Sequence, residues 1–274
     1  MEEAQRKPVI RPFATKEEMA QVAVLEKAVW GMDATPVHQL YTAVKNGGIL
    51  LGAFDRDRAV GFQYSFAGFD GNRAYLCSHM LGILPEYRHS GLGADMKRVQ
   101  ASIARNLGYD LVRWTFDPLE SRNAYLNIRK LGGVVGTYIE NCYGEMTDEL
   151  NAGLPTDRFE VDWWVRGQRV TDGLRAEPAE PARPFEINLT GAGLPVLEAD
   201  RLVLPESRAF SVPVPARFQE LKKSDAPLAL DWRLKTRELF LRAFENGYVL
   251  EDVERRDEKV NEYVLRVKDE VPLG

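Results

Sequence analysis

One junction in the middle of the sequence constrains the fold more than any other feature. Three apolar runs between residues 49 and 84 are separated by turns that contain Asp and Gly, which predicts an antiparallel meander. Directly after Leu84 the apolar spacing changes to the helical period of 3.6. The helical stripe consists of Leu92, Met96, Val99, Ile103 and Leu107. A turn with two glycines, at residues 88–93, therefore joins the last strand of a meander to an amphipathic helix.

The pattern of the first 170 residues predicts an α+β fold with a mixed, largely antiparallel sheet flanked by helices. Thr15 and Glu18 fit a capping box that opens a helix, and Gly47 and Gly48 end the next one. A strand–helix–strand crossover follows the meander. The expected strands are 8–13, 49–54, 59–68, 75–84, 110–116, 134–146 and 159–170, and the expected helices are 15–30, 36–45, 92–107 and 121–132.

The composition of the chain changes once, where three prolines stand between residues 177 and 184 and predict an extended linker. We place a domain boundary near residue 171. The segment 1–170 is the expected catalytic domain, and 171–274 is a small α+β extension in which no chemistry can be recognised. Within the extension we expect strands at 185–189, 201–204 and 210–214, a helix at 225–246, and a hairpin of 248–254 with 262–267.

Charge and composition exclude several classes of protein. The 274 residues carry 36 Lys and Arg against 41 Asp and Glu, and this acidic balance predicts that the chain does not bind nucleic acid. No apolar run reaches the roughly 20 residues of a membrane span, and the polar start lacks a signal-peptide core, so we expect a cytoplasmic protein without membrane contact. Cys77 and Cys142 offer neither a disulfide scaffold nor metal-ligand spacing, and no metal is expected.

The glycine-containing turn has the chemistry of an anion site. A helix N-terminus presents free backbone N–H groups and a partial positive charge. Gly91 and Gly93 would let the main chain approach an anion closely, and Arg88 adds a fixed cation. The alternative is an ordinary tight turn before a helix. No Gly-Lys-Ser/Thr follows, and no glycine stands at 96, so a P-loop or Rossmann site is disfavoured.

The turn resembles the acyl-CoA-binding motif of the GNAT superfamily of N-acetyltransferases, in which Arg/Gln-x-x-Gly-x-Gly/Ala joins the fourth strand to the third helix. The resemblance covers about residues 5–170 in element order as well as motif. It is closer still to a bacterial subgroup of predicted acyltransferases with a C-terminal extension. The segments that carry it are Pro85-Glu86-Tyr87-Arg88, Ser78-His79-Met80-Leu81-Gly82, Trp114-Thr115-Phe116-Asp117-Pro118-Leu119, Arg122-Asn123-Ala124, Lys130-Leu131-Gly132 and 154–159.

The resemblance implies which residues bind acetyl-CoA or another acyl-CoA. The pyrophosphate would be held by Arg88, His89, Ser90, Gly91, Leu92, Gly93 and Ala94. Gly82 and Ile83 would face the pantetheine and the acyl carbonyl, and a backbone N–H near Gly82 would stabilise the oxyanion. Asn123 and Asn127 are candidates for the pantetheine or adenine arm, although Asn123 also fits an ordinary residue of a first helical turn.

The catalytic residues are less clearly marked than the binding residues. Members of the family often carry a Glu on the fourth strand as general base, but no acid stands between Arg73 and Leu84 here. His79 takes that place, and a neutral imidazole suits the role. The alternatives for His79 are a core histidine or a residue that shapes the pocket. Glu26 and Asp117 are weaker candidates for the base, and either could bind the substrate ammonium instead.

The usual acid for the leaving thiolate is missing. In the family it is a Tyr four residues before the Gly of Lys-Leu-Gly, and that position is Ile128 here. Tyr125, Tyr138, Tyr143 or water could replace it, and we take Tyr143 as the candidate. A second departure is glycine at position 133, where a Phe is common.

These residues predict an acyl-CoA-dependent N-acyltransferase that transfers acetyl, or a larger acyl such as succinyl, directly to the primary amine of a small molecule such as an amino acid. No cysteine stands in the motif, which favours direct transfer over an acyl-enzyme. One alternative is a non-catalytic acyl-CoA-binding or interaction module, and another is a generic phosphate or nucleotide binder. Residues 171–274 would either cap the acceptor pocket or dock a second subunit in a homodimer.

Overall fold

The computed structural model of the chain describes residues 7–31, 34–88, 90–144, 153–177, 180–198 and 203–273. The chain divides into two compact units, residues 1–114 and 115–274. The predicted boundary near residue 171 does not coincide with the boundary between these units. It separates an expected catalytic domain from an expected extension, and it stays a prediction. None of the helices described is both long enough and apolar enough to span a membrane.

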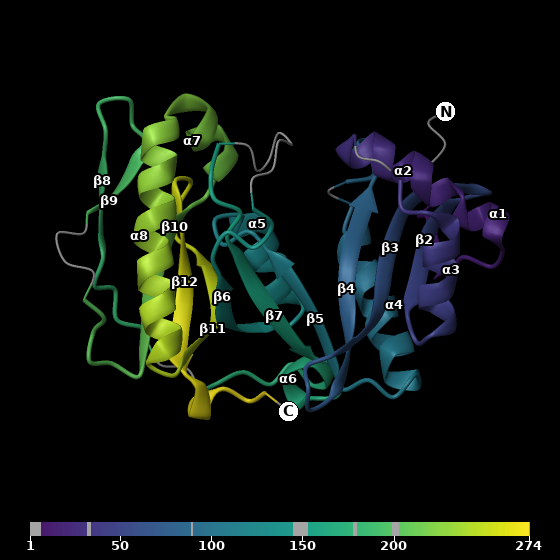
Figure 1. Cartoon of the computed structure of the whole chain (residues 1–274). Coiled ribbons are helices and arrows are strands. Elements are labelled where there is room, and N and C mark those ends of the chain that lie inside the picture. Colours follow the sequence, from purple (N-terminus) through teal and green to yellow (C-terminus); the bar gives the residue numbers. More distant parts are fainter. Residues whose placement is uncertain are drawn as a thin grey trace. The chain divides into compact units, whose positions relative to one another are not determined.

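The first unit follows the predicted order of elements closely (Figure 1). Its elements are β1 (Val9–Pro12), α1 (Lys16–Met19), α2 (Gln21–Trp30), α3 (Val37–Lys45), β2 (Ile49–Asp55), β3 (Arg58–Phe69), β4 (Ala74–Ile83), a 3-10 turn (Pro85–Tyr87), α4 (Leu92–Asn106) and β5 (Leu111–Phe116), which contains the boundary. The Thr15 hydroxyl accepts a hydrogen bond from the Glu18 amide at 3.2 Å, so the predicted N-cap is confirmed.

The sheet of this unit has the order β1-β2-β3-β4-β5. The pairs from β1 to β4 are antiparallel. The pair β4–β5 is parallel, and its register covers only Leu76 with Val112 and Cys77 with Arg113. The remaining length of β4, up to the glycine-containing turn, lies beyond this short ladder.

The helices of the first unit cover opposite faces of its sheet. On β3, Phe62 packs edge-on against Trp30 of α2, with ring centroids 5.7 Å apart. The next residue, Gln63, faces the other way, as side chains alternate along a strand. On that second face Gln100 of α4 hydrogen-bonds Ser65 at 2.5 Å. Thus α2 lies on one face of β3 and β4, and α4 lies on the other.

The second unit contains a sheet with the order β7-β6-β11-β12-β10, in which neighbours are antiparallel, and a separate ribbon of β8 and β9. Helix α8 packs along this sheet (Figure 1). The elements are α5 (Ser121–Ala124), a π-helical stretch (Tyr125–Lys130), β6 (Val134–Ile139), β7 (Arg158–Trp164), α6 (Gln168–Thr171), β8 (Glu186–Leu189), β9 (Pro195–Glu198), β10 (Ala209–Pro215), α7 (Phe218–Ser224), α8 (Ala226–Glu245), β11 (Tyr248–Arg255), β12 (Val260–Val267) and a 3-10 turn (Lys268–Glu270).

Several predicted strands of this unit are wrong in part. The strand expected at 159–170 ends at Trp164, because a turn follows and the buried Arg169 of α6 donates to the Gly132 carbonyl at 3.1 Å. A strand expected at 201–204 is not found at Val203 and Leu204, and residues 201 and 202 lie outside the described part. Helix α7 was not expected. The predicted fold class, α+β with a largely antiparallel sheet and flanking helices, is confirmed.

Candidate active site

The turn between β4 and α4 is open at its backbone. Gly91 is the N-cap of α4, with φ at +84°, a conformation that side chains other than glycine rarely adopt. A Cβ atom placed on Gly91 would meet no atom of the described residues within 4 Å. One placed on Gly93 would meet the side chains of Ile83 and Leu81, at 3.5 and 3.7 Å, and nothing else in the part of the chain that the structure describes. The space beside these two glycines can therefore receive a ligand.

No side chain among the described residues caps the N-terminus of α4. The only acid in its first turn, Asp95, is paired with Lys7 at 2.6 Å and with Arg98 at 2.9 Å. The pKa of Asp95 is lowered chiefly by its hydrogen bond to Lys7. The half-positive end of the helix thus keeps its amide donors for an anion. This arrangement fits the diphosphate of an acyl-CoA.

Arg88 is exposed beside this turn, and its Nε donates to the Ile83 carbonyl at 3.0 Å. That bond holds the guanidinium at the end of β4 and leaves its remaining N–H groups toward solvent. Ser90 is exposed, and its hydroxyl donates to the Tyr87 carbonyl at 2.7 Å. His89, also predicted to bind the pyrophosphate, lies outside the described residues. Leu92 and Ala94 are buried in the first turn of α4, so only their backbones can serve.

Gly82 is tightly enclosed, unlike Gly91. A Cβ atom on Gly82 would lie 2.7 Å from the Phe62 ring and 3.2 Å from Trp30. Glycine is therefore required at this point of β4 by its neighbours on the α2 face. Ile83 follows at the end of the strand and is half-buried. Both residues lie at the part of β4 that extends beyond its ladder with β5, as the expected contact with pantetheine requires.

His79 is the extra residue of a bulge in β4. The register pairs Ser65 with Ser78 and then Tyr64 with Met80, which leaves His79 without a partner on β3. Its ring lies against Phe66 and Tyr64, with centroids 5.5 and 6.2 Å away. His79 is exposed overall, but partial desolvation against these rings still lowers the pKa of His79, and the negative charge of Glu26 partly opposes that shift. The imidazole is therefore held neutral near pH 7.

Glu26 is buried on α2, and both of its oxygens are engaged. They accept hydrogen bonds from the Thr35 amide at 2.7 Å and from the Thr35 hydroxyl at 2.6 Å. A carboxylate with these two partners orders the segment before α3. Its remaining influence on the site is electrostatic, through its charge near His79.

In the second unit, Asp117 is held by structural partners. One oxygen accepts from the Leu119 amide at 2.8 Å, and the other accepts from Arg233 of α8 at 2.6 Å. Arg158 lies 3.8 Å from the same oxygen. The Arg233 side chain is only 1% exposed, so this is a buried ion pair. These contacts are those of a structural carboxylate.

The other candidates of the second unit lie on α5, on the π-helical stretch and after β6. Asn123 is exposed and Asn127 is buried. Ile128, at the position of the usual Tyr, is fully buried. The hydroxyl of Tyr143 is 2.8 Å from that of Thr115, and its side chain is exposed. Tyr143 thus has the accessibility that a proton donor needs.

Two other sequence features of the second unit are explained by packing. The Tyr138 hydroxyl donates to Asp157 at 2.5 Å, and burial raises the pKa of Tyr138 far above its usual range, which makes it a poor acid. A Cβ atom at Gly133 would lie 2.6 Å from Val161 and 2.9 Å from the Asn127 carbonyl. A Phe at position 133 would therefore not fit this backbone.

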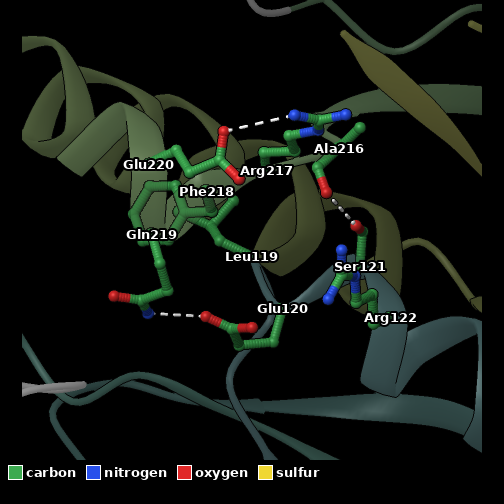
Figure 2. A pocket seen from close by; sticks show the side chains of 9 residues that line it. All are labelled: Leu119, Glu120, Ser121, Arg122, Ala216, Arg217, Phe218, Gln219 and Glu220. Carbon is green, nitrogen blue, oxygen red and sulfur yellow. Dashed lines mark hydrogen bonds and ion pairs between the residues drawn. The ribbon is translucent and has the colours of Figure 1, made fainter. Parts of the chain in front are cut away.

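A small pocket of the second unit lies between α5 and α7 (Figure 2), and its lining includes Leu119, whose amide donates to Asp117. Gln219 donates to Glu120 across it at 2.6 Å, and Ser121 donates to the Ala216 carbonyl at 3.1 Å. Burial raises the pKa of Glu120. The lining pairs its own charges, since Arg217 also lies 3.4 Å from Glu220.

One buried polar group was not expected from the sequence, where Lys97 counts as one of the helix cations beside the turn. Lys97 and Gln100 of α4 are buried, and both contact Ser78 at 2.9 Å. Lys97 also lies 3.5 Å above the centroid of the Trp114 ring. Burial lowers the pKa of Lys97 to about 7. The only sequence signal was the i, i+3 spacing of two polar residues beside the apolar stripe.

Comparison with solved structures finds acetyltransferases. The chain is similar to an N-acetyltransferase from Staphylococcus aureus Mu50, with 13% identity over 59% of this chain and 100% of that chain (TM-score 0.48). It is also similar to yncA, a putative acetyltransferase from Salmonella typhimurium solved with its cofactor acetyl-CoA, with 15% identity over 58% and 95% of the two chains (TM-score 0.47). A third is a putative acetyltransferase of the GNAT family from Desulfovibrio desulfuricans, with 15% identity over 57% and 98% (TM-score 0.45).

No protein-family model matches the chain, and no curated protein matches it.

Proposed function

We propose that this chain is an acyl-CoA-dependent N-acyltransferase. The observation that carries the proposal is the junction of β4 and α4. There a left-handed Gly91, an uncapped helix N-terminus and the exposed Arg88 form an open anion cradle. The motif Arg88-x-x-Gly91-x-Gly93 matches this geometry position by position. The acetyltransferases to which the chain is similar are consistent with it.

In this proposal Arg88 and the backbone amides of residues 91–94 bind the diphosphate of the acyl-CoA, with His89 and Ser90 beside them. Gly82 and Ile83 face the pantetheine, Asn123 and Asn127 contact the rest of the arm, and a backbone N–H near Gly82 donates to the acyl oxygen. The co-substrate supplies an acyl group activated as a thioester. The protein contributes position and electrostatic stabilisation.

His79 is the proposed general base. Its neutral imidazole accepts a proton from the ammonium of the acceptor, and the negative charge of Glu26 favours the imidazolium that results. The amine nitrogen then forms a bond to the acyl carbon and the carbon–sulfur bond breaks. The nitrogen gives up its remaining extra proton, and Tyr143 or water relays this proton to the leaving thiolate. Asp117 is a weaker candidate for the base, because its carboxylate is bound by Arg233.

The acceptor we propose is the primary amine of a small molecule such as an amino acid, and the acyl group is acetyl or a larger one such as succinyl. Thiol release measured with acetyl-CoA and succinyl-CoA against a panel of amino acids tests this. We expect one pair of substrates to release CoA in step with the amide formed. Release that is equal with and without amine would contradict transfer.

One observation favours the alternative of a non-catalytic acyl-CoA-binding module. Ile128 is fully buried where the family usually places its acid, so that position holds no proton donor. Calorimetric titration with acetyl-CoA and with ATP, together with a turnover assay, distinguishes the three hypotheses. Preference for acetyl-CoA with turnover supports the enzyme, preference without turnover on any amine supports the module, and equal affinity for both supports a generic phosphate site.

A further inference from the structure

A buried polar cluster lies under β4, on the face covered by α4. It consists of Gln63 and Ser65 on β3, Ser78 on β4, and Lys97 and Gln100 on α4, each at most 5% exposed. The Gln100 amide nitrogen is 2.5 Å from the Ser65 hydroxyl and 2.9 Å from that of Ser78. Lys97 donates to Ser78 at 2.9 Å, and Gln63 lies 3.4 Å from it. One helix therefore bridges two adjacent strands by side chains.

The bridge stands at the register shift between these strands. Ser65 and Ser78 are partners, and the next pair, Tyr64 with Met80, skips His79. A bulge interrupts the ladder and leaves the extra residue free to shift. Gln100 contacts both members of the last regular pair before the bulge, so its side chain fixes the point at which the register changes.

This arrangement is costly for stability, which indicates a purpose other than stability. Buried polar groups without partners destabilise a fold. The side-chain oxygens of Gln63 and Gln100 are buried without a hydrogen-bond partner among the described residues, and the other buried residues of α4, apart from Lys97, are apolar. Leucine or methionine at position 100 would avoid the penalty. Polar residues retained at such a cost are expected at functional sites.

Ser78 and His79 are adjacent in β4, and their side chains lie on opposite faces of the sheet, as side chains alternate along a strand. Ser78 contacts α4, and the His79 ring lies against Phe66 and Tyr64 on the α2 face. A bond that fixes Ser78 therefore also limits the backbone angles from which His79 departs. The same helix bears the anion cradle at its first turn, and Gln100 follows about two turns later.

We propose that Gln100, together with Lys97, is a positioning residue that holds the β4 bulge through Ser65 and Ser78 and so fixes the His79 ring. The catalytic consequence rests on the proposed function. The structural consequence does not, because it concerns the ring of His79 in the free protein.

The structural arm of the test uses proton NMR of the histidine rings in Gln100→Ala. The chain has three histidines, and the His79 signal is assigned by its loss in His79→Gln. We expect this signal to move toward its position in an unfolded chain, because the ring leaves Phe66 and Tyr64. The matched control is Asn106→Ala, which removes an exposed amide from the same helix and should leave the signal in place.

The kinetic arm measures CoA release from acetyl-CoA. In Gln100→Ala we expect kcat to fall by about tenfold or more while KM for acetyl-CoA changes by less than about twofold. A folded Gln100→Ala with an unmoved His79 signal overturns the positioning role. A moved signal with unchanged kcat overturns its catalytic consequence.

Two further outcomes are also informative. If the wild-type protein releases CoA equally with and without amine, the proposed function fails, but the NMR arm still decides the positioning role. If Gln100→Ala does not fold, Ser65→Ala replaces it, because this change removes only the β3 end of the bridge. Its His79 signal should move in the same direction, and an unmoved signal counts against the proposal.

Discussion

The environment of His79 sets a pH dependence for the proposed reaction. Desolvation against Phe66 and Tyr64 lowers its pKa below the ordinary value, so the neutral base is present at pH 7 and is lost only under more acidic conditions. The wild-type rate should fall with a midpoint below about pH 6.5. His79→Gln should reduce kcat by about 10²-fold near pH 7. The difference in kcat between His79→Gln and the wild type should become smaller as the pH approaches the pKa of the acceptor amine, because the amine then loses its proton without a base.

Initial rates of CoA release between pH 5.5 and 9.5 measure this profile, and calorimetry should show unchanged affinity for acetyl-CoA. His38→Gln is the matched control, since His38 is exposed on α3. Turnover of His79→Gln equal to the wild type at every pH would remove His79 from the mechanism.

Lys97 links stability to pH. Its pKa is about 7 in the folded protein because of burial, well below that of a free lysine. Between pH 7 and about 10.4 the unfolded chain therefore binds a proton that the folded chain lacks, and this penalty decreases as the pH rises. For one proton, the free energy of unfolding changes by at most about 1.4 kcal/mol per pH unit. Lys97→Met should remove this contribution to the pH dependence.

Urea unfolding at pH 7 and pH 9 checks this expectation. The free energy of unfolding of Lys97→Met, minus that of the wild type, should be larger at pH 7 than at pH 9. A difference that is the same at both pH values would mean that Lys97 keeps its proton in the folded protein.

At the level of elements, the junction of β4 and α4 makes a sharp prediction for ligand binding. Gly91→Glu places a negative charge in the open space beside the helix N-terminus and strains a backbone with φ at +84°. We expect no measurable binding of acetyl-CoA. Gly71→Glu is the matched control, because Gly71 has φ at +90° and equally open surroundings in the β3–β4 turn.

Calorimetric titration of both variants with acetyl-CoA separates backbone strain from loss of the cradle. Both should lose some thermal stability, since both adopt the same left-handed conformation. Only Gly91→Glu should lose the ligand. Retained affinity in Gly91→Glu, or equal loss in both, would refute the cradle.

This junction was predictable because its signals are local. The change of period, the two glycines and Arg88 lie within a few residues of one another. The buried face of α4 was predictable only in part. Leu92 and Met96 are buried as the stripe predicts, but Leu107 is 52% exposed while Lys97 is buried. The helical period predicts the spacing of the buried residues of α4. The strands that pack against the helix decide which neighbouring positions are buried as well.

Contacts between distant parts of the sequence could not be predicted from the sequence alone. Asp117 ends a strand and reads from sequence as a candidate base, but its partner Arg233 is 116 residues away. The bulge at His79 depends likewise on side chains from β3 and α4, and no pattern within β4 signals it. Sequence reasoning did identify His79 as a candidate general base, because no acid stands on that strand.

At the level of the whole molecule, the segment after residue 171 is part of the core of the second unit. Strand β11 pairs with β6 through Leu250 and Val135. Phe240 of α8 packs against Phe159 with ring centroids 4.8 Å apart. The extension therefore covers strands that the sequence assigns to the catalytic domain.

The extension also neutralises buried acids. Arg237 of α8 binds both oxygens of Asp157 at 2.8 Å, and Asp157 is fully buried. Arg233 binds one oxygen of the partly buried Asp117 at 2.6 Å. Removing one member of a buried ion pair costs about 3–5 kcal/mol, because the other charge is left without compensation. Two such losses approach the whole stability of an ordinary domain.

A chain that ends at residue 170 should therefore fail to fold cooperatively, although the predicted boundary lies there. The missing segment removes Arg233 and Arg237 together with the strand that pairs with β6. Thermal unfolding followed by circular dichroism should show one sharp transition for the full chain and none for the truncated one. Asp117→Asn with Arg233→Met in the full chain is the control, since it removes both members of the Asp117–Arg233 pair, and it should unfold cooperatively. If the truncated chain kept a sharp transition and bound acetyl-CoA, residues 171–274 would be a dispensable appendage, and the pairing of β11 with β6 would contribute little to the fold.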